Sequence, residues 1–215
     1  MPRDATATRA VLLRQAERLF AERGVHQATV REITQAAGQR NVSALAYHFG
    51  SREGILRAIL TRHGDPLDVE RGELLSEPLA QMTTRALLAA LLVPYARRLG
   101  DEEGRDYLRI VAQLTATFPL WRATDLAWPN LTRVLDTLEH RVPGGDPATQ
   151  RERVVNAVML LTAAFAERAR VVDAGRPPGR SEEAFVANLA DMLVAGLDAP
   201  AGPPLPTGSP EGRRG

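Results

Sequence analysis

The sequence predicts an all-α protein with an N-terminal three-helix domain that contains a helix-turn-helix, a larger C-terminal helical domain and a short tail. Apolar residues recur three and four positions apart through most of the chain, and no segment shows the strict alternation of a β-strand. Clusters of glycine and proline divide this pattern into segments of helix length. We place the three parts at residues 1–63, 64–198 and 199–215.

Composition fits a globular protein. The chain has 215 residues, of which 44% are hydrophobic, and this is enough to bury a substantial core. It contains no run of about 18 apolar residues, and its N-terminal segment lacks the apolar core of a signal peptide. We therefore expect a cytoplasmic protein without a membrane partner. The absence of cysteine excludes disulfides, thiol catalysis and thiolate metal sites.

The first of two short central helices has a clear beginning and end. It follows a longer helix expected over residues 9–23. Thr29 and Glu32 have the spacing of a capping box, which predicts that a helix starts at Val30. Gly38 can adopt the left-handed conformation that ends a helix. The helix therefore has about two turns.

A second short helix is expected from Val42 to about His48, after a polar bridge. Asn41 is its expected cap. Val42, Leu45 and Phe49 are spaced to face inward, which leaves the polar side chains outside. Two short helices joined by a glycine turn are typical of a DNA-reading element.

The remaining helices follow from caps and breaks. Ser51 is expected to cap a fourth helix over residues 52–63, which Gly64-Asp65-Pro66 should end. The tail after Asp198 has nine Pro and Gly in 17 residues, which predicts disorder. The C-terminal domain should contain helices near residues 80–99, 102–117, 129–141, 147–173 and 181–197.

Three sequence segments in the right order carry a family resemblance. LFAERG ends the first helix, TVREITQAAG forms the next, and YHFGSREGIL closes the helix-turn-helix. Over residues 8–62 the chain resembles the N-terminal domain of TetR-family transcriptional regulators. It departs from the family pattern by one additional residue between Gly38 and Phe49. The resemblance implies a DNA-binding regulator, most often a repressor.

Charge is concentrated in the same region. Residues 1–63 hold ten Arg against five Asp and Glu, whereas the remainder holds 17 against 21. A basic N-terminal domain suits contact with phosphates, and a helix in the major groove reads base edges. Arg40 could instead be a solvated turn residue, and His48 a partly packed one. The base-reading candidates are Arg40, Asn41, Ser43 and Ala44, and the phosphate candidates are Thr29, Tyr47, His48 and Arg52.

The resemblance implies a ligand pocket in the C-terminal domain, for a small apolar or amphipathic effector. Aromatic, methionine and polar side chains on the expected helices are the candidates for its wall, although such side chains also serve as ordinary core packing. These candidates are Tyr107, Gln113, Leu114, Thr117, Phe118, Trp121, Trp128 and Met159.

The resemblance also implies a homodimer in which the last two helices pair with those of a second copy. Both helices carry more apolar residues than a single packed face needs, but they could also be core helices of a monomer. The interface candidates are Val158, Phe165, Phe185, Leu189, Met192 and Leu193.

No pattern of an enzyme is present. The four histidines are scattered, and the chain has no HExxH, no glycine-rich phosphate loop and no GxSxG. We expect no catalysis, cofactor or metal. The favoured hypothesis is a ligand-responsive transcriptional regulator that binds a palindromic double-stranded DNA operator as a homodimer. The alternative is a DNA-binding interaction protein controlled by a protein partner.

Overall fold

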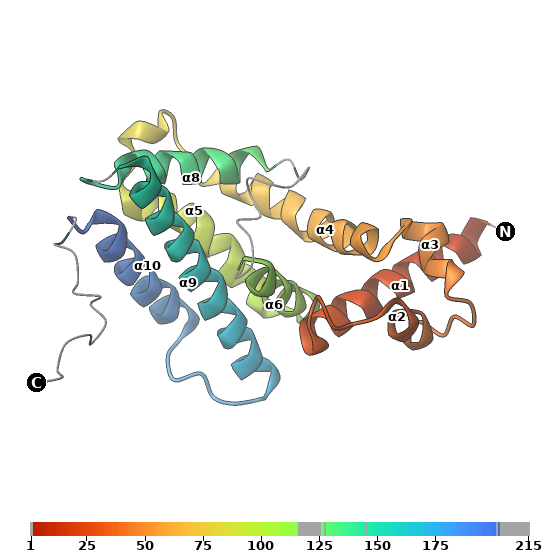
Figure 1. Cartoon of the computed structure of the whole chain (residues 1–215). Coiled ribbons are helices and arrows are strands. Elements are labelled where there is room, and N and C mark those ends of the chain that lie inside the picture. Colours follow the sequence, from red (N-terminus) through yellow and green to blue (C-terminus); the bar gives the residue numbers. More distant parts are fainter. Residues whose placement is uncertain (1, 116–125, 127, 145, 201, 203–215) are drawn as a thin grey trace, which may run out of the picture.

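The computed structural model describes residues 2–115, 126, 128–144, 146–200 and 202, and every regular element in these ranges is a helix. The predicted all-α class is confirmed. Figure 1 shows α1, α2 and α3 together at one end of the molecule, with α4 running from them to the other helices. Among the described residues, no helix has the length and apolarity needed to span a membrane.

The N-terminal helices are α1 (Pro2–Arg23), α2 (Val30–Ala36) and α3 (Ser43–Phe49). The predicted capping box is present, since the Thr29 hydroxyl accepts the Glu32 N–H at 3.2 Å and the Glu32 carboxylate accepts the Thr29 N–H at 2.8 Å. Gly38 has a φ of 68°, as expected for the end of α2. The core of this domain consists of buried side chains from all its helices, namely Leu12, Ala16, Phe20, Ile33, Leu45 and Ile55.

Helix α4 (Arg52–Glu73) corrects one prediction. Ser51 caps it as expected, but the helix continues through Pro66 instead of ending before it. Pro66 lies on the exposed face, where water can solvate the carbonyl that proline leaves without a donor, while Leu67 beside it is fully buried. Burial of the second half of the helix therefore outweighs the helix-breaking tendency of proline.

The C-terminal helices lie close to their predicted ranges. The expected helix at 80–99 is divided, because Met82 is extended and Thr83 caps a new helix. The ranges predicted from proline and glycine positions at 129–141 and 147–173 agree with the structure. The elements are η1 (Leu79–Gln81), α5 (Thr84–Arg97), η2 (Arg98–Gly100), α6 (Glu102–Thr115), α8 (Pro129–Arg141), α9 (Pro147–Asp173) and α10 (Glu182–Asp198).

Helix α6 lies at the centre of the molecule. It packs against α9 in the C-terminal domain and against α1 in the N-terminal domain, and α4 contacts α5, α6 and α8 (Figure 1). α10 packs beside α5 and α9. The two ends of the molecule are therefore joined both by the continuous helix α4 and by the contact of α1 with α6.

Candidate nucleic-acid interface and buried cavity

Helix α3 is held by one buried residue and exposes the side chains around it. Leu45 is 1% exposed, whereas Tyr47 is 82% exposed. Ser43 on the first turn and Arg40 in the preceding turn are also exposed. These side chains can reach a DNA surface without unfolding any part of the domain.

The beginning of α3 differs from the prediction. The N-cap is Val42, and Asn41 accepts the Ser43 N–H at 2.9 Å from one position further back. Val42 was predicted to face inward but is 50% exposed, because it precedes the helix and lies outside its buried stripe. Asn41 therefore orders the turn with its oxygen, and its exposed amide nitrogen remains available.

Several DNA candidates have other contacts in the structure. Ala44 packs against the core, so a base-reading role does not fit its position. Arg52 donates from Nε to the Ala28 carbonyl at 3.0 Å and lies 5.1 Å above the Phe20 ring, which fastens α4 to α1 and the turn after it. The Thr29 hydroxyl is occupied by the capping box.

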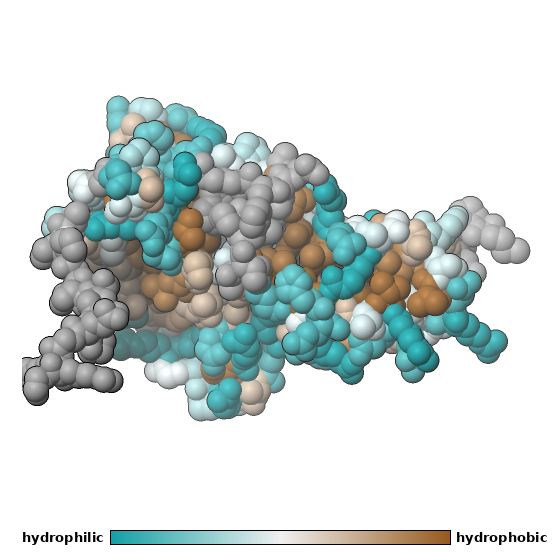
Figure 2. Space-filling model, viewed as in Figure 1, coloured by the Kyte–Doolittle hydropathy of each residue, from teal (hydrophilic) through white to brown (hydrophobic). Residues whose placement is uncertain are grey.

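His48 lies at the edge of a hollow of about 990 Å³ between α1 and α4. Its ring contacts that of Tyr47 edge to face, with centroids 5.0 Å apart. Arg9 and Arg57 line the hollow, and Arg9 lies 4.7 Å above the Phe49 ring. Figure 2 shows hydrophobic side chains reaching the surface around α1 and α4. The sequence did not single out Arg9 or Arg57, because only the folded chain brings α1 and α4 beside α3.

The two domains meet in a set of buried charges. Glu17 of α1 is fully buried and contacts Nε2 of His63 in α4, and the His63 ring stacks on Tyr107 of α6 at 4.7 Å. Asp106, 1% exposed, accepts from Arg14 of α1 at 2.6 Å. Burial by itself lowers the pKa of Arg14, but the hydrogen bond and charge of Asp106 outweigh it and raise this pKa above its ordinary value. An ion pair thus ties α6 to α1, and ring stacking ties α6 to α4.

Gln113 belongs to this junction and not to the ligand pocket predicted for it. Its Oε1 accepts the Val25 N–H at 2.7 Å, and its Nε2 donates to the Phe20 carbonyl at 3.1 Å. The half-buried side chain therefore satisfies backbone groups at the end of α1.

A cavity of about 40 Å³ is enclosed by α4, α5, α6, α8 and α9. Two of the predicted pocket residues, Tyr107 and Trp128, line this cavity, whereas Leu114 is buried but is not part of its wall. Met159 was predicted to line it but is 37% exposed on another face of α9. The candidates Thr117, Phe118 and Trp121 lie outside the described residues.

Among the described residues that line the cavity, Arg71 is the charged one, and the sequence did not predict it. Its side chain is 3% exposed. Leu60, the buried Leu67 and Arg71 lie on one face of α4, because they are seven and four residues apart. This spacing was visible in the sequence, but the predicted break at Gly64-Asp65-Pro66 concealed it. A buried arginine inside an otherwise largely apolar wall marks a site where a negative charge can bind.

Three of the six predicted interface residues are buried inside the protomer. Phe165, Leu189 and Leu193 are at most 3% exposed, and Val158 lines the cavity. Phe185 packs its ring edge to face against Phe165 at 5.3 Å. A place in a dimer interface does not fit the burial of Phe165, Leu189 and Leu193. Both sides of α9 and α10 are apolar, and the sequence does not indicate which side faces inward.

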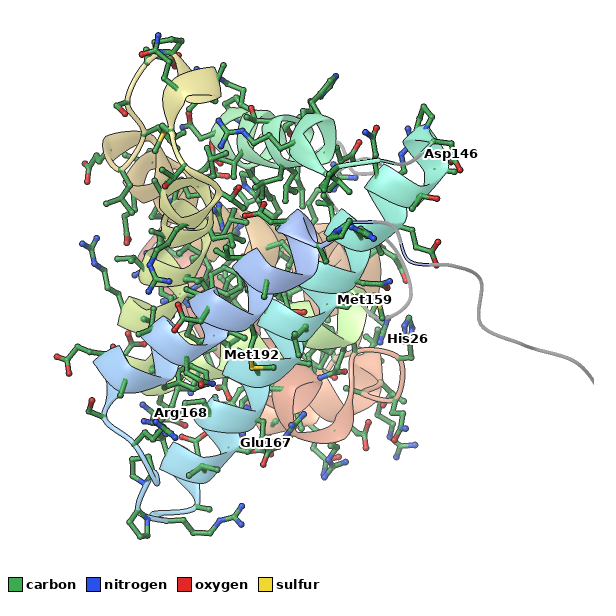
Figure 3. The ribbon with its side chains drawn as sticks, turned by 90° about the vertical axis from the view of Figure 1, so that its left-hand side faces the viewer. His26, Asp146, Met159, Glu167, Arg168 and Met192 are labelled. Atoms are coloured by element: carbon green, nitrogen blue, oxygen red, sulfur yellow. The ribbon has the colours of Figure 1, made fainter. Side chains whose placement is uncertain are left out.

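Three exposed apolar residues of these helices form a different set, which we call the α9/α10 face: Met159, Leu160 and Met192. Their exposed fractions are 37%, 42% and 53%. Figure 3 shows α9 and α10 side by side, with Met159 and Met192 on the face toward the viewer. Leu160 and Met192 also line a hollow of about 280 Å³ between the helices. Of the predicted interface residues, only Met192 belongs to this face.

Family models match both parts of the chain. Residues 12–59 match the model of bacterial regulatory proteins of the tetR family, and residues 85–196 match a C-terminal domain described as tetracyclin repressor-like. Neither model describes an enzyme. No curated protein matches the chain.

Solved structures with the same fold include three regulators. A probable transcriptional regulatory protein, RHA5900, is 23% identical with a TM-score of 0.55, over 91% of this chain and all of that one. NalD from Pseudomonas aeruginosa, the secondary repressor of the MexAB-OprM multidrug efflux pump, is 21% identical with a TM-score of 0.56, over 91% and 98%. A TetR family transcriptional regulator from Pseudomonas syringae pv. tomato str. DC3000 is 19% identical with a TM-score of 0.52, over 87% and 95%.

Proposed function

The chain belongs to the TetR family of bacterial regulatory proteins, and we propose that this DNA-binding transcriptional regulator is a repressor. It binds a palindromic operator as a homodimer. It releases the operator when a small molecule binds the C-terminal domain. The observation that carries the proposal is the pair α2 and α3 within the matched region, with Tyr47 exposed beside the buried anchor Leu45. The likeness to NalD, which is named a repressor, supports the sign of regulation.

The contacts with DNA divide into two kinds. Arg40 and Ser43 are exposed where α3 begins, and the first residues of a recognition helix reach base edges in the major groove. Tyr47 and His48 at the other end of α3, with Arg9 and Arg57 in the adjacent hollow, can hold the phosphate backbone. We therefore assign sequence reading to Arg40 and Ser43.

The α9/α10 face supports the proposed homodimer. Exposed apolar side chains gathered on one face of two long helices favour burial against a second copy, since a two-fold axis lets the same face serve both protomers. To read an inverted repeat with half-sites one helical turn apart, a two-fold dimer must present two copies of α3 about 34 to 36 Å apart.

The ligand response is proposed for the buried cavity. A volume of about 40 Å³ accommodates little more than one water molecule, so an effector must move part of the wall. Leu60 contributes to that wall from α4, the helix that also carries the core of the DNA-binding domain. An effector that favours the expanded cavity therefore favours a different position of α4.

The test begins with selection of genomic fragments by the purified protein at about 150 mM salt, which suppresses purely electrostatic binding. Recovery of an inverted repeat supports the proposal, and recovery of no enriched sequence by folded dimeric protein contradicts it. Arg40→Ala should then weaken binding by about 1 to 3 kcal/mol and relax specificity at one base pair. Tyr47→Phe should weaken binding to all DNA sequences equally. Arg176→Ala, in the loop between α9 and α10, removes the same charge as Arg40→Ala and serves as its control.

The alternative function is a DNA-binding protein that responds to a protein partner. A thermal-shift screen of the dimer against a metabolite library separates the two. A compound that both stabilises the protein and releases the selected DNA supports the ligand response, whereas release only by a protein fraction supports the partner.

A further inference from the structure

Arg71 brings a positive charge into the wall of the buried cavity. Its side chain is 3% exposed, and its guanidinium lies 5.8 Å from the centroid of the Tyr95 ring. Nε is buried, and none of the described residues accepts a hydrogen bond from it. A buried cation is retained at a large desolvation cost, so its surroundings must contain a compensating anion or be prepared to receive one.

Asp68 compensates this charge only in part. Its Oδ1 lies 3.6 Å from Nη1 of Arg71, which is an ion pair but too long for a hydrogen bond. Both carboxylate oxygens accept from the first turn of α8 instead, at 3.0 Å from the Asn130 N–H and 2.8 Å from the Leu131 N–H. Asp68 therefore caps α8 from α4, and the positive end of that helix already shares its charge.

The two tyrosines beside the cavity supply no anion. Burial raises the pKa of Tyr95, with Arg71 acting in the opposite direction, and burial raises the pKa of Tyr107 as well. Both phenols are neutral at physiological pH. A second polar group faces the same cavity, formed by the hydroxyls of Thr115 and Thr162 at 2.8 Å from each other.

We propose that the cavity binds a small carboxylate with an apolar body, whose charged end pairs with Arg71. The rest of the wall is mainly aliphatic and aromatic, including Leu60, Val111 and Trp128, and these side chains suit the hydrocarbon part of such a molecule. A carboxylate matches a guanidinium in two parallel hydrogen bonds. A doubly charged phosphate would leave one charge unpaired in this apolar wall.

This inference rests on the ligand response proposed above, and it narrows the effector to one chemical class. The wild-type dimer is titrated by calorimetry with matched pairs of probes: octanoate and octanamide, phenylacetate and phenylacetamide, and octyl phosphate as the third anion. We expect at least one carboxylate to bind about tenfold or more tightly than its amide, since a hydrogen bond to a charged group commonly contributes that much. Equal binding of acid and amide, preference for the phosphate, or binding of no carboxylate would overturn the inference.

Variants then locate the charge. Arg71→Met keeps the bulk of the side chain and should bring the ratio of acid to amide affinity close to one, and Arg71→Lys should keep a preference for the acid. Arg97→Met removes an arginine of α5 with a half-exposed side chain and should leave the ratio unchanged. If Arg71→Met does not fold, the acid and amide affinities of the wild-type protein and of Arg71→Lys still test the inference. An acid preference that persists unchanged in folded Arg71→Met contradicts the assignment.

The same samples separate this inference from the proposed function. Binding to the selected DNA fragment is measured with and without each probe. A carboxylate that binds through Arg71 but leaves DNA affinity unchanged supports the site and contradicts the ligand response. If a neutral compound binds the cavity and releases the DNA while no carboxylate binds, the ligand response is supported and the proposed carboxylate site is overturned.

Discussion

Gly64→Ala tests how the cavity is closed. Gly64 lies within α4, and the indole of Trp128 packs directly on its backbone. A Cβ at this position would lie 2.8 Å from Nε1 of Trp128 and closer still to two ring carbons. Trp128 is 7% exposed and donates from Nε1 to Asp65 at 3.0 Å, so the ring cannot simply turn into solvent.

The expected magnitude follows from opposing effects. Replacing glycine by alanine inside a helix stabilises by about 1 kcal/mol, because glycine loses more backbone entropy. Overpacking of a buried site typically destabilises by about 1 to 3 kcal/mol, and a lost hydrogen bond adds about 0.5 to 1.5 kcal/mol. The variant should therefore lose about 1 to 3 kcal/mol, a decrease in Tm of roughly 2 to 12 °C for a chain of this size.

The assay is denaturant and thermal unfolding at fixed protomer concentration, since dimerisation alters apparent stability. The effect of Gly64→Ala on the free energy of unfolding should change sign in a second variant that lacks the indole ring. In Trp128→Leu the ring is absent, so Gly64→Ala should become neutral or stabilising by up to about 1 kcal/mol. Equal destabilisation in both backgrounds would refute the claim that the indole is the obstacle.

Three further predictions concern other parts of the molecule. Met192→Glu places a charge on the α9/α10 face and should raise the dimer dissociation constant at least about tenfold by analytical ultracentrifugation, whereas Val69→Glu on α4 should not. Thr29→Ala removes a cap and should lower the free energy of unfolding by about 1 kcal/mol in urea. The hydrogen bond from the Thr29 N–H lowers the pKa of Glu32 below its ordinary 4.5. The stability that this hydrogen bond contributes is therefore present above pH 4.5 and lost as the pH falls through the lowered pKa. Glu32→Gln should remove the contribution of Glu32 to the acid dependence of unfolding.

The features that the sequence predicted well are local ones. The beginning of α8 follows from the proline at its first helical position, and that of α2 from the capping box. Such signals act within one turn of the chain, so they need no knowledge of what packs nearby. The all-α class follows from the spacing of apolar residues along the chain, which is likewise a local signal.

The features that it predicted poorly depend on tertiary contacts. Pro66 indicates a break, and only the burial of Leu67 and Arg71 explains why α4 continues. On α9, Phe165 and Met159 are both apolar, and only the fold determines that the first is buried and the second exposed. Likewise, Arg52 has the charge of a phosphate contact but is held by Ala28 of its own domain.

The continuity of α4 has a mechanical consequence for the proposed switch. Its 22 residues extend over about 33 Å at the usual helical rise, with Ser51 as the cap near α3 and Arg71 at the cavity. If expansion of the cavity tilts the helix by about 5° around its Arg71 end, the other end moves by roughly 3 Å. In a dimer whose recognition helices must lie about 34 to 36 Å apart, opposite displacements of that size change the spacing by about 6 Å. A helix that ended before Pro66 would reach the cavity wall only through Leu60, whereas the continuous helix reaches it through Leu60 and Arg71. The part of α4 that the sequence failed to predict therefore carries the charged residue of the cavity wall.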